Sequence, residues 1–438
     1  MRQFCSYGPV DCQEHFCVQR QALIAKGVEQ LIANPEKGGH YFTIWAPRQT
    51  GKTWLMRQLE QAIEQQYPEK FTLLNFSMGG LRGMSFTPSE NSAFPETFAE
   101  LLQEKLPNKP TVSSWKEFRD LFSKTEGLWD RPLILLIDEV DTIPLALIDL
   151  MVAQFRELYL DRKNNWLHGL ALVGVRAVLG IESQRGSPFN IQRSLKVPNL
   201  TPEEVKELYR QYQEESGQPI EAAVVDKIYQ STKGQPGLVS WFGEMLTEKY
   251  NPGTHQVIDM ETWELIWHKA RFVEQNNTVM NLIAKARMSE YQAFLIKVFT
   301  HSSEQFSFHD PKCSYMYLHG IITSETIQRA NGGLGEICRF SSPFIQDCLY
   351  YALTNEIVAD ETAILSLQPL DDLADVFAGT GNLLNLPALL TRYKDYLARL
   401  KDQGINPWKE QPRRKTDFKL KEAVGHFHLF NAAMGCSV

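Results

Sequence analysis

One stretch of the chain has the residue types that bind a nucleotide phosphate. It runs from Ala46 to Thr53 and reads APRQTGKT. The pattern GxxxxGK[ST] describes a loop whose backbone N–H groups converge on phosphate at the N-terminus of a helix. In such a loop, Gly51 would allow close approach of the backbone, Lys52 would reach the β- and γ-phosphates and Thr53 would bind Mg²⁺. We predict a phosphate-binding loop here. The alternative is a chance GKT at a helix start, since Ala46 replaces the first glycine of the pattern.

We expect the residues of this loop, together with the residue that follows it, to contact the nucleotide. They are Ala46, Pro47, Arg48, Gln49, Thr50, Gly51, Lys52, Thr53 and Trp54. Alanine adopts most backbone conformations apart from those with positive φ, so the departure at Ala46 is compatible with the loop.

A pair of acidic residues follows a second apolar stretch, LLIDE. A phosphate-binding loop needs an acid at the end of a neighbouring strand to hold the Mg²⁺ shell. We expect Asp138 to contact this shell beside Thr53, and Glu139 to orient and polarise the attacking water. The alternative is a strand that ends in acidic side chains pointing to solvent.

Basic side chains near the end of a later apolar stretch are candidates for sensing the γ-phosphate. The stretch GLALVGV ends at Arg176, which we predict as the sensor and as a third catalytic residue. Arg185 and Arg193 are weaker candidates, and a surface arginine at a strand end is the alternative for Arg176. We interpret His40 as structural.

Short apolar stretches alternate with helical patterns over the first half of the chain. We predict strands at 41–46, 71–78, 132–138 and 169–175, and helices at 20–33, 53–66, 94–106, 115–124 and 147–162. Wholly apolar strands are typical of a parallel sheet covered on both faces. Their alternation with helices predicts an α/β fold with three layers.

The pattern becomes helical near Thr201, where a threonine cap and acidic residues begin a helix. We expect four parts: a P-loop ATPase core at 1–200, a helical lid at 201–275, a winged-helix domain at 276–358 and a helical C-terminal region at 359–438.

Composition restricts the compartment and the partners. A net charge of −7 does not favour binding to nucleic acid or anionic membrane except through a local basic patch. The chain has no apolar stretch that could span a bilayer and no secretory signal at its N-terminus. The seven cysteines have irregular spacing, so we expect free thiols rather than a disulfide framework or a metal site, and a cytoplasmic location.

These residues resemble the prokaryotic AAA-like ATPases of the STAND and archaeal origin-recognition type. The resemblance covers roughly residues 7–355. It rests on APRQTGKT and LLIDEVD, with support from YGPVD…HFCVQR at 7–20, the strand ending in Arg176, SPFN at 187–190 and TKGQPGLV at 232–239.

The resemblance implies roles for further residues. The segment around Phe16, Val18 and Arg20 would pass near the adenine base. Gly234-Gln235-Pro236 matches the GxP motif of a helical lid, in which Pro236 packs against the nucleotide. A turn between two helices is the alternative interpretation of these residues.

The segment EAVGHFHLF near the C-terminus is similar to the first helix of a PD-(D/E)XK nuclease domain. The chain ends at Val438, shortly after this helix and before the strands that would carry the metal ligands. We expect no nuclease activity from Glu422 alone, and we interpret His426 and His428 as packing or surface residues.

The sequence therefore predicts an ATPase that uses ATP and Mg²⁺ as a molecular switch, in which the nucleotide state sets the positions of lid and winged helix. It would act on an unidentified protein partner and assemble in a nucleotide-dependent oligomer, without contact to a membrane. The alternatives are a DNA-binding ATPase and a scaffold that holds nucleotide without hydrolysis. Few basic residues (Lys297, Lys312, Arg329) lie in 289–330, and the basic run at 412–415 lies in a predicted linker.

Overall fold

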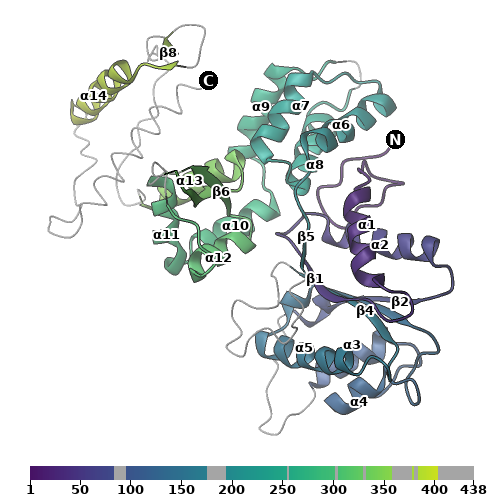
Figure 1. The fold of residues 1–438 in the computed structure, drawn as a ribbon. Helices are drawn as coiled ribbons and strands as arrows, with labels where there is room; N and C mark the ends of the chain where they lie inside the picture. The colour runs from purple at the N-terminus through teal and green to yellow at the C-terminus, as the bar shows by residue number, and fades with distance from the viewer. Residues whose placement is uncertain are drawn as a thin grey trace, which may run out of the picture. The chain divides into compact units, whose positions relative to one another are not determined.

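The computed structural model describes residues 1–82, 95–174, 194–253, 256–300, 304–328, 332–357, 377–378 and 383–402 (Figure 1). The chain divides into two compact units. The first contains residues 1–280, 307–323 and 340–345, and the second contains residues 281–306, 324–339 and 346–438. No helix among the described residues is long and apolar enough to cross a membrane.

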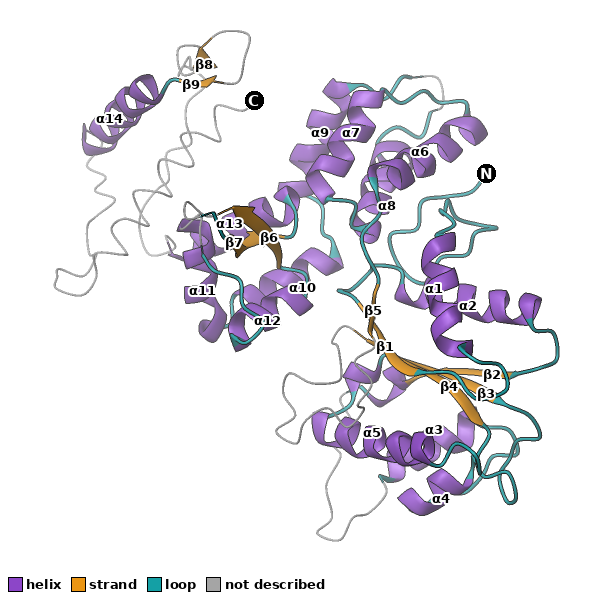
Figure 2. Cartoon of the chain, viewed as in Figure 1, coloured by secondary structure: helices purple, strands orange, loops and turns teal. Residues whose placement is uncertain are grey.

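A parallel sheet of five strands forms the centre of the first unit (Figure 2). Its strands are β1 (Tyr41–Trp45), β2 (Thr72–Ser77), β3 (Leu133–Asp138), β4 (Leu167–Gly174) and β5 (Ser194–Lys196). They lie in the order β2-β3-β4-β1-β5, and every neighbouring pair is parallel. The four strands predicted from the sequence are confirmed, and β5 is an edge strand that the sequence pattern did not indicate.

Helices cover both faces of this sheet, so the predicted three-layer α/β fold is confirmed. On one face lie α1 (Gln21–Ile32) and α2 (Lys52–Gln66); on the other lie α3 (Glu96–Lys105), α4 (Trp115–Asp120) and α5 (Leu145–Leu160). The side chains of β3 alternate between the two cores. Leu133, Leu135 and Ile137 pack with the α3–α5 side, and Ile134 and Leu136 pack with the α1–α2 side. This alternation explains why residues 133–137 of the strand are all apolar.

A helical segment follows the sheet within the first unit. It contains α6 (Pro202–Ser216), α7 (Ala222–Thr232), α8 (Pro236–Glu244), the π-helical turn η3 (Met245–Lys249) and α9 (Met260–Phe272). The predicted helix start at Thr201 is present: its hydroxyl accepts the backbone N–H of Glu204, whose side chain accepts the backbone N–H of Thr201 in return.

The N-terminal segment, residues 1–20, packs against these helices. Phe4 contacts the rings of Phe16, Tyr209 and Tyr212, with ring centroids 5.0, 5.0 and 5.6 Å away. Gly243 of α8 leaves room for the Phe4 ring, because a Cβ there would lie 2.5 Å from it. The segment is therefore part of the apolar core that α6 and α8 form.

Two cysteines of this segment form a disulfide, which corrects the prediction of free thiols. Cys12 and Cys17 are joined, with their Cα atoms 5.5 Å apart. Cys5, which is partly buried, and Cys313, Cys338 and Cys348, which are buried, are not part of a disulfide. No group of three or more His, Cys, Asp and Glu that could hold a metal ion occurs among the described residues.

Short helices and one pair of strands make up the following part of the chain. The elements are α10 (Asn277–Ala286), α11 (Ser289–Thr300), α12 (Pro311–Leu318), β6 (Ile322–Gln328), β7 (Leu334–Phe340) and α13 (Pro343–Ile357). β6 and β7 pair in a two-stranded sheet. Helices followed by paired strands are compatible with the winged-helix domain predicted for 276–358, which stays a prediction.

The remaining described elements are β8 (Phe377–Ala378) and β9 (Leu383–Leu384), which pair in antiparallel fashion, and α14 (Leu386–Asp402). Glu422, His426, His428 and the basic run at 412–415 lie outside the described residues.

Candidate nucleotide-binding site

The loop between β1 and α2 has the backbone geometry that a phosphate-binding loop requires. Gly51 has φ +85°, in the left-handed region that favours glycine, and directly precedes the first residue of α2. Gln49, at the tip of the loop, has φ +56°. Ala46 is completely buried and is not among the residues with positive φ, so alanine fits the position of the first glycine. The N-terminus of α2 thus faces the space enclosed by this loop.

Lys52 is the charged group at the centre of this loop. Its Nζ donates to the backbone carbonyls of Ala46 and Pro47, at 2.9 and 2.7 Å. Burial lowers the pKa of Lys52 from 10.5 to about 8, and the nearby carboxylates of Asp141 and Asp138 oppose this effect. A buried ammonium with this orientation is suited to meet the negative charge of a phosphate.

Thr53 and Asp138 come together from two different elements. The Thr53 hydroxyl, at the start of α2, donates to Oδ2 of Asp138 at the end of β3, with a distance of 2.8 Å. The backbone N–H of Glu139 donates to the other carboxylate oxygen at 2.8 Å. Burial raises the pKa of Asp138, and these two hydrogen bonds oppose the shift. A hydroxyl and a carboxylate side by side are the oxygen ligands that Mg²⁺ prefers, so this pair fits the predicted metal.

Glu139 is held by residues that the sequence did not single out. Its Oε2 accepts the Ser77 hydroxyl at 3.0 Å, and its Oε1 pairs with Nη2 of Arg82 at 3.2 Å. The backbone of Glu139 has φ +54°. Gly79 lies against the carboxylate, since a Cβ there would be 1.8 Å from Oε2. Glu139 therefore has a defined position beside Asp138, set by β2 and the turn that follows it.

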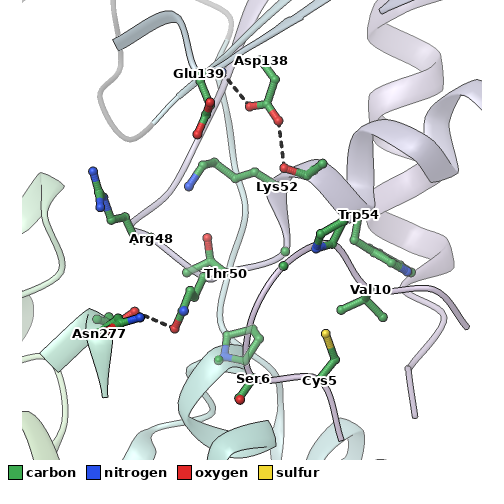
Figure 3. A pocket seen from close by; sticks show the side chains of 18 of the residues that line it. Cys5, Ser6, Val10, Arg48, Thr50, Lys52, Trp54, Asp138, Glu139 and Asn277 are labelled. Atoms are coloured by element: carbon green, nitrogen blue, oxygen red, sulfur yellow. Dashed lines mark hydrogen bonds between the residues drawn. The ribbon is translucent and has the colours of Figure 1, made fainter. Parts of the chain in front are cut away.

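Lys52, Thr53, Asp138 and Glu139 line one cavity of about 460 Å³ (Figure 3). Asp138, Glu139 and the Lys52 side chain lie at one end of the view, and Cys5, Ser6 and Val10 of the N-terminal segment lie at the other. Such a volume is within the range of pockets that hold a small-molecule ligand. Further lining residues that the sequence analysis missed are Thr142, Ser240, Asn277 and Thr278.

The turn into α8 contacts the tip of the phosphate-binding loop directly. The backbone N–H of Gly237 donates to the carbonyl of Gln49 at 3.0 Å, and Nε2 of Gln235 donates to the carbonyl of Arg48 at 3.1 Å. Pro236 lines the cavity. The GQPG segment thus forms the turn into α8 and also contacts the loop. The packing of Pro236 against a nucleotide stays a prediction.

Other predicted site residues lie elsewhere. Phe16, Val18 and Arg20 do not line the cavity, which corrects the expectation that they pass near the base. The ring of Phe16 packs on Phe4 and Tyr212, and Arg20 bonds to Glu204 and to backbone carbonyls. Residues 5, 6 and 8–10 of the same segment line the cavity instead. Arg176, Arg185, Arg193 and SPFN (187–190) lie outside the described residues.

Comparison with known proteins now places the chain. Residues 5–260, more than half of its length, match the family described as AAA-like domain. This protein belongs to the AAA-like domain family. The match begins at the N-terminal segment and ends at the first residue of α9, so it includes the loop, both carboxylates and the contact of α8 with the loop, but not Asn277 and Thr278.

Solved structures with related folds share little sequence with the chain. The Walker-type ATPase paby2304 of Pyrococcus abyssi is 14% identical with a TM-score of 0.49, and the alignment covers 79% of this chain and 99% of that chain. The Thermotoga maritima RuvB Holliday junction branch migration motor is 13% identical with a TM-score of 0.38, covering 78% and 96%. The Aeropyrum pernix ORC1 protein in complex with DNA is 15% identical with a TM-score of 0.34, covering 78% and 92%.

The curated proteins contain no match to the sequence. The family assignment therefore rests on the sequence match to AAA-like domains.

Proposed function

We propose that this protein binds ATP with Mg²⁺ and hydrolyses it. The observation that carries the proposal is the convergence on one cavity of Lys52, of the Thr53–Asp138 pair and of Glu139. Backbone N–H groups of the loop and the ammonium of Lys52 bind phosphate oxygens. Thr53 and Asp138 would hold Mg²⁺, which when bound neutralises charge that develops on the phosphates.

Glu139 is the proposed base in this reaction. Its carboxylate borders the cavity, where it accepts a proton from an attacking water and orients that water toward the γ-phosphate. The bonds from Ser77 and Arg82 hold the carboxylate in its present place, so they help to define the point from which Glu139 acts. Arg176, directly downstream of β4, stays the predicted sensor of the γ-phosphate.

The same site supports a nucleotide-dependent switch. Gln235 and Gly237 of the proposed lid donate hydrogen bonds to backbone carbonyls of the phosphate-binding loop. A conformational change in this loop is therefore transmitted to α8. A ligand shifts a conformational equilibrium when it contacts the two states differently, and the γ-phosphate with Mg²⁺ is such a ligand. A protein partner, nucleotide-dependent oligomerisation and a winged helix at 276–358 belong to this proposal.

The test is steady-state ATP hydrolysis by the full chain, measured for wild type, Glu139→Gln and Lys52→Ala. We expect wild-type turnover, a loss of roughly 10²-fold or more in Glu139→Gln, and ATP binding that survives Glu139→Gln and not Lys52→Ala. Equal turnover in wild type and Glu139→Gln would contradict the role of Glu139. Unchanged affinity in Lys52→Ala would contradict the whole site.

Duplex DNA added to the same assay distinguishes the two kinds of ATPase considered above. Stimulation of wild-type turnover by DNA would favour a DNA-dependent enzyme. Turnover that DNA does not change favours a switch that acts on a protein partner.

A further inference from the structure

The tip of the phosphate-binding loop is contacted by more than the lid. Gln49 occupies this tip with φ +56°, a backbone conformation that is uncommon for residues other than glycine. Its backbone carbonyl accepts the N–H of Gly237 at 3.0 Å and Nε2 of Gln235 at 3.3 Å. A Cβ on Gly237 would lie 2.7 Å from the Gln49 side chain, so α8 approaches the tip as closely as a glycine allows.

The side chain of Gln49 makes a separate contact with α10. Its Oε1 accepts the hydroxyl of Thr278 at 2.5 Å, across 229 positions of sequence. Thr278 is buried, and the neighbouring Asn277 faces the cavity from the same turn (Figure 3). Asn276 accepts the backbone N–H groups of Thr278 and Val279 with its Oδ1, which fixes the start of the helix. The first turn of α10 thus borders the nucleotide cavity in a defined orientation.

The other side of the loop contacts α12. A Cβ on Gly320, which has φ +80°, would lie 2.8 Å from the Pro47 ring, so the chain after α12 passes directly over the loop. Nearby, Nζ of Lys196 donates to the Tyr317 hydroxyl at 2.6 Å and lies 5.4 Å from the centroid of the Trp45 ring. Residues 47–49 are therefore enclosed by α8, α10 and the end of α12.

We propose that Gln49 and Thr278 are positioning residues that couple the phosphate-binding loop to α10. The inference rests on the proposed function and adds to it the point at which nucleotide binding is transmitted. A phosphate held by the backbone N–H groups of the loop restricts the conformation of Gln49, and a fixed Gln49 side chain favours the bonded position of Thr278. Because coupling is reciprocal, the Thr278 bond in turn favours nucleotide binding.

The position of α10 in the chain gives this bond its consequence. The matched family region ends at residue 260, and the chain passes from the first compact unit to the second between Met280 and Asn281, inside α10. Thr278 thus joins the loop to α10, the helix in which the chain leaves the first unit. Asn277 would contact the nucleotide from this same helix, as a polar side chain on the cavity wall.

The test compares Thr278→Val, which keeps the shape and removes the hydroxyl, with Thr278→Ser, which restores it. Gln49→Met removes the acceptor from the other side. Thr262→Val is the matched control, since its hydroxyl donates to Asp259 at 2.8 Å at the start of α9, outside the cavity lining. Two readouts are needed: the affinity for ATP and ADP, and the protection of amides 277–286 from hydrogen exchange with and without nucleotide.

We expect Thr278→Val and Gln49→Met to lose the nucleotide-dependent protection of α10 and to bind ATP about fivefold more weakly or worse. Thr278→Ser and Thr262→Val should match the wild type. If the wild type binds nucleotide and both bond-breaking variants give the same affinity and protection as the wild type, the coupling is contradicted but the proposed function is not. If wild type binds no nucleotide, the proposed function falls and the coupling falls with it.

Discussion

At the scale of single residues, Lys52 gives the site a dependence on pH. Its buried ammonium has a pKa of about 8, below its ordinary 10.5, because burial disfavours the charged form more than Asp141 and Asp138 favour it; Arg48 opposes the charge and Glu139 supports it. The Lys52 side chain therefore binds more protons in the unfolded chain than in the folded chain between pH 8 and pH 10.5. In that window this group makes the free energy of unfolding rise with pH.

Nucleotide binding should show the opposite trend. Phosphate oxygens stabilise the ammonium form, so binding above pH 8 must be accompanied by proton uptake at Lys52. We expect the affinity for ADP to be constant below pH 7.5 and to fall above pH 8, approaching about tenfold per pH unit. Calorimetric titrations at pH 8.5 in two buffers of different ionisation enthalpy measure the proton uptake. Constant affinity from pH 7 to pH 9.5, with no uptake, would show that Lys52 is charged throughout.

The residues that the sequence singled out around Lys52 are those whose spacing along the chain is local. Thr53 follows it in the same motif, and Asp138 with Glu139 ends a strand whose apolar run is easily recognised. Ser77 and Arg82 could not be found in this way. They contact Glu139 because β2 lies beside β3 with Ser77 in register with Asp138. A local sequence pattern does not specify the order of strands in a sheet.

At the scale of elements, the turn from α7 into α8 depends on one glycine. Gly234 has φ +70°, and a Cβ there would lie 2.0 Å from the backbone carbonyl oxygen of Leu200. The Leu200 N–H donates to the Gly234 carbonyl at 2.8 Å, so the two segments are fixed to each other. This close approach places Gln235 and Gly237 against the phosphate-binding loop.

We expect Gly234→Ala to lower the free energy of unfolding by about 2–4 kcal/mol, through backbone strain and overlap with Leu200. Gly217→Ala is the control, because Gly217 has a matching φ of +71° at the end of α6 but no atom within 4 Å of its Cβ position. That variant should lose only about 1 kcal/mol. Denaturant unfolding of both variants measures the difference, and equal losses would show that the contact with Leu200 contributes nothing.

The predictability of the elements follows the length and burial of each. The strands β1, β3 and β4 are fully buried and mostly apolar, so the sequence pattern was sufficient to predict them. The strand β5 has three residues with one buried side chain, and it exists because its backbone pairs with β1. The contact of α10 with the loop was equally inaccessible, since Thr278 has no motif around it and its partner is more than half the chain away.

At the scale of the molecule, the N-terminal segment connects α6 and α8 to the cavity of the candidate site. Arg2 pairs with Glu215 of α6, Phe4 fills the space above Gly243, and Gln211 of α6 donates to the Cys17 carbonyl at 2.9 Å. Residues 5, 6 and 8–10 of the same segment line the cavity. The segment, which we call the strap, therefore joins α6 and α8 to the cavity, and its shape affects both.

The Cys12–Cys17 disulfide sets the shape of this strap, and its removal is the broadest test of the structure. Cys12 and Cys17 are partly exposed, within reach of a thiol reductant, and the Trp54 indole N–H lies 3.5 Å from Cys12 Sγ. A loop this short loses about 2 kcal/mol of stabilisation when its disulfide is opened. We expect reductant to lower the midpoint of thermal unfolding by roughly 4 °C and to weaken ADP binding, because the strap both packs on α6 and α8 and lines the cavity.

The Cys12→Ser, Cys17→Ser double variant is the control for this prediction. It should resemble the reduced protein, and reductant should not change it further. If the double variant still responds, the effect comes from another thiol, and if the wild type does not respond, the disulfide does not support the strap.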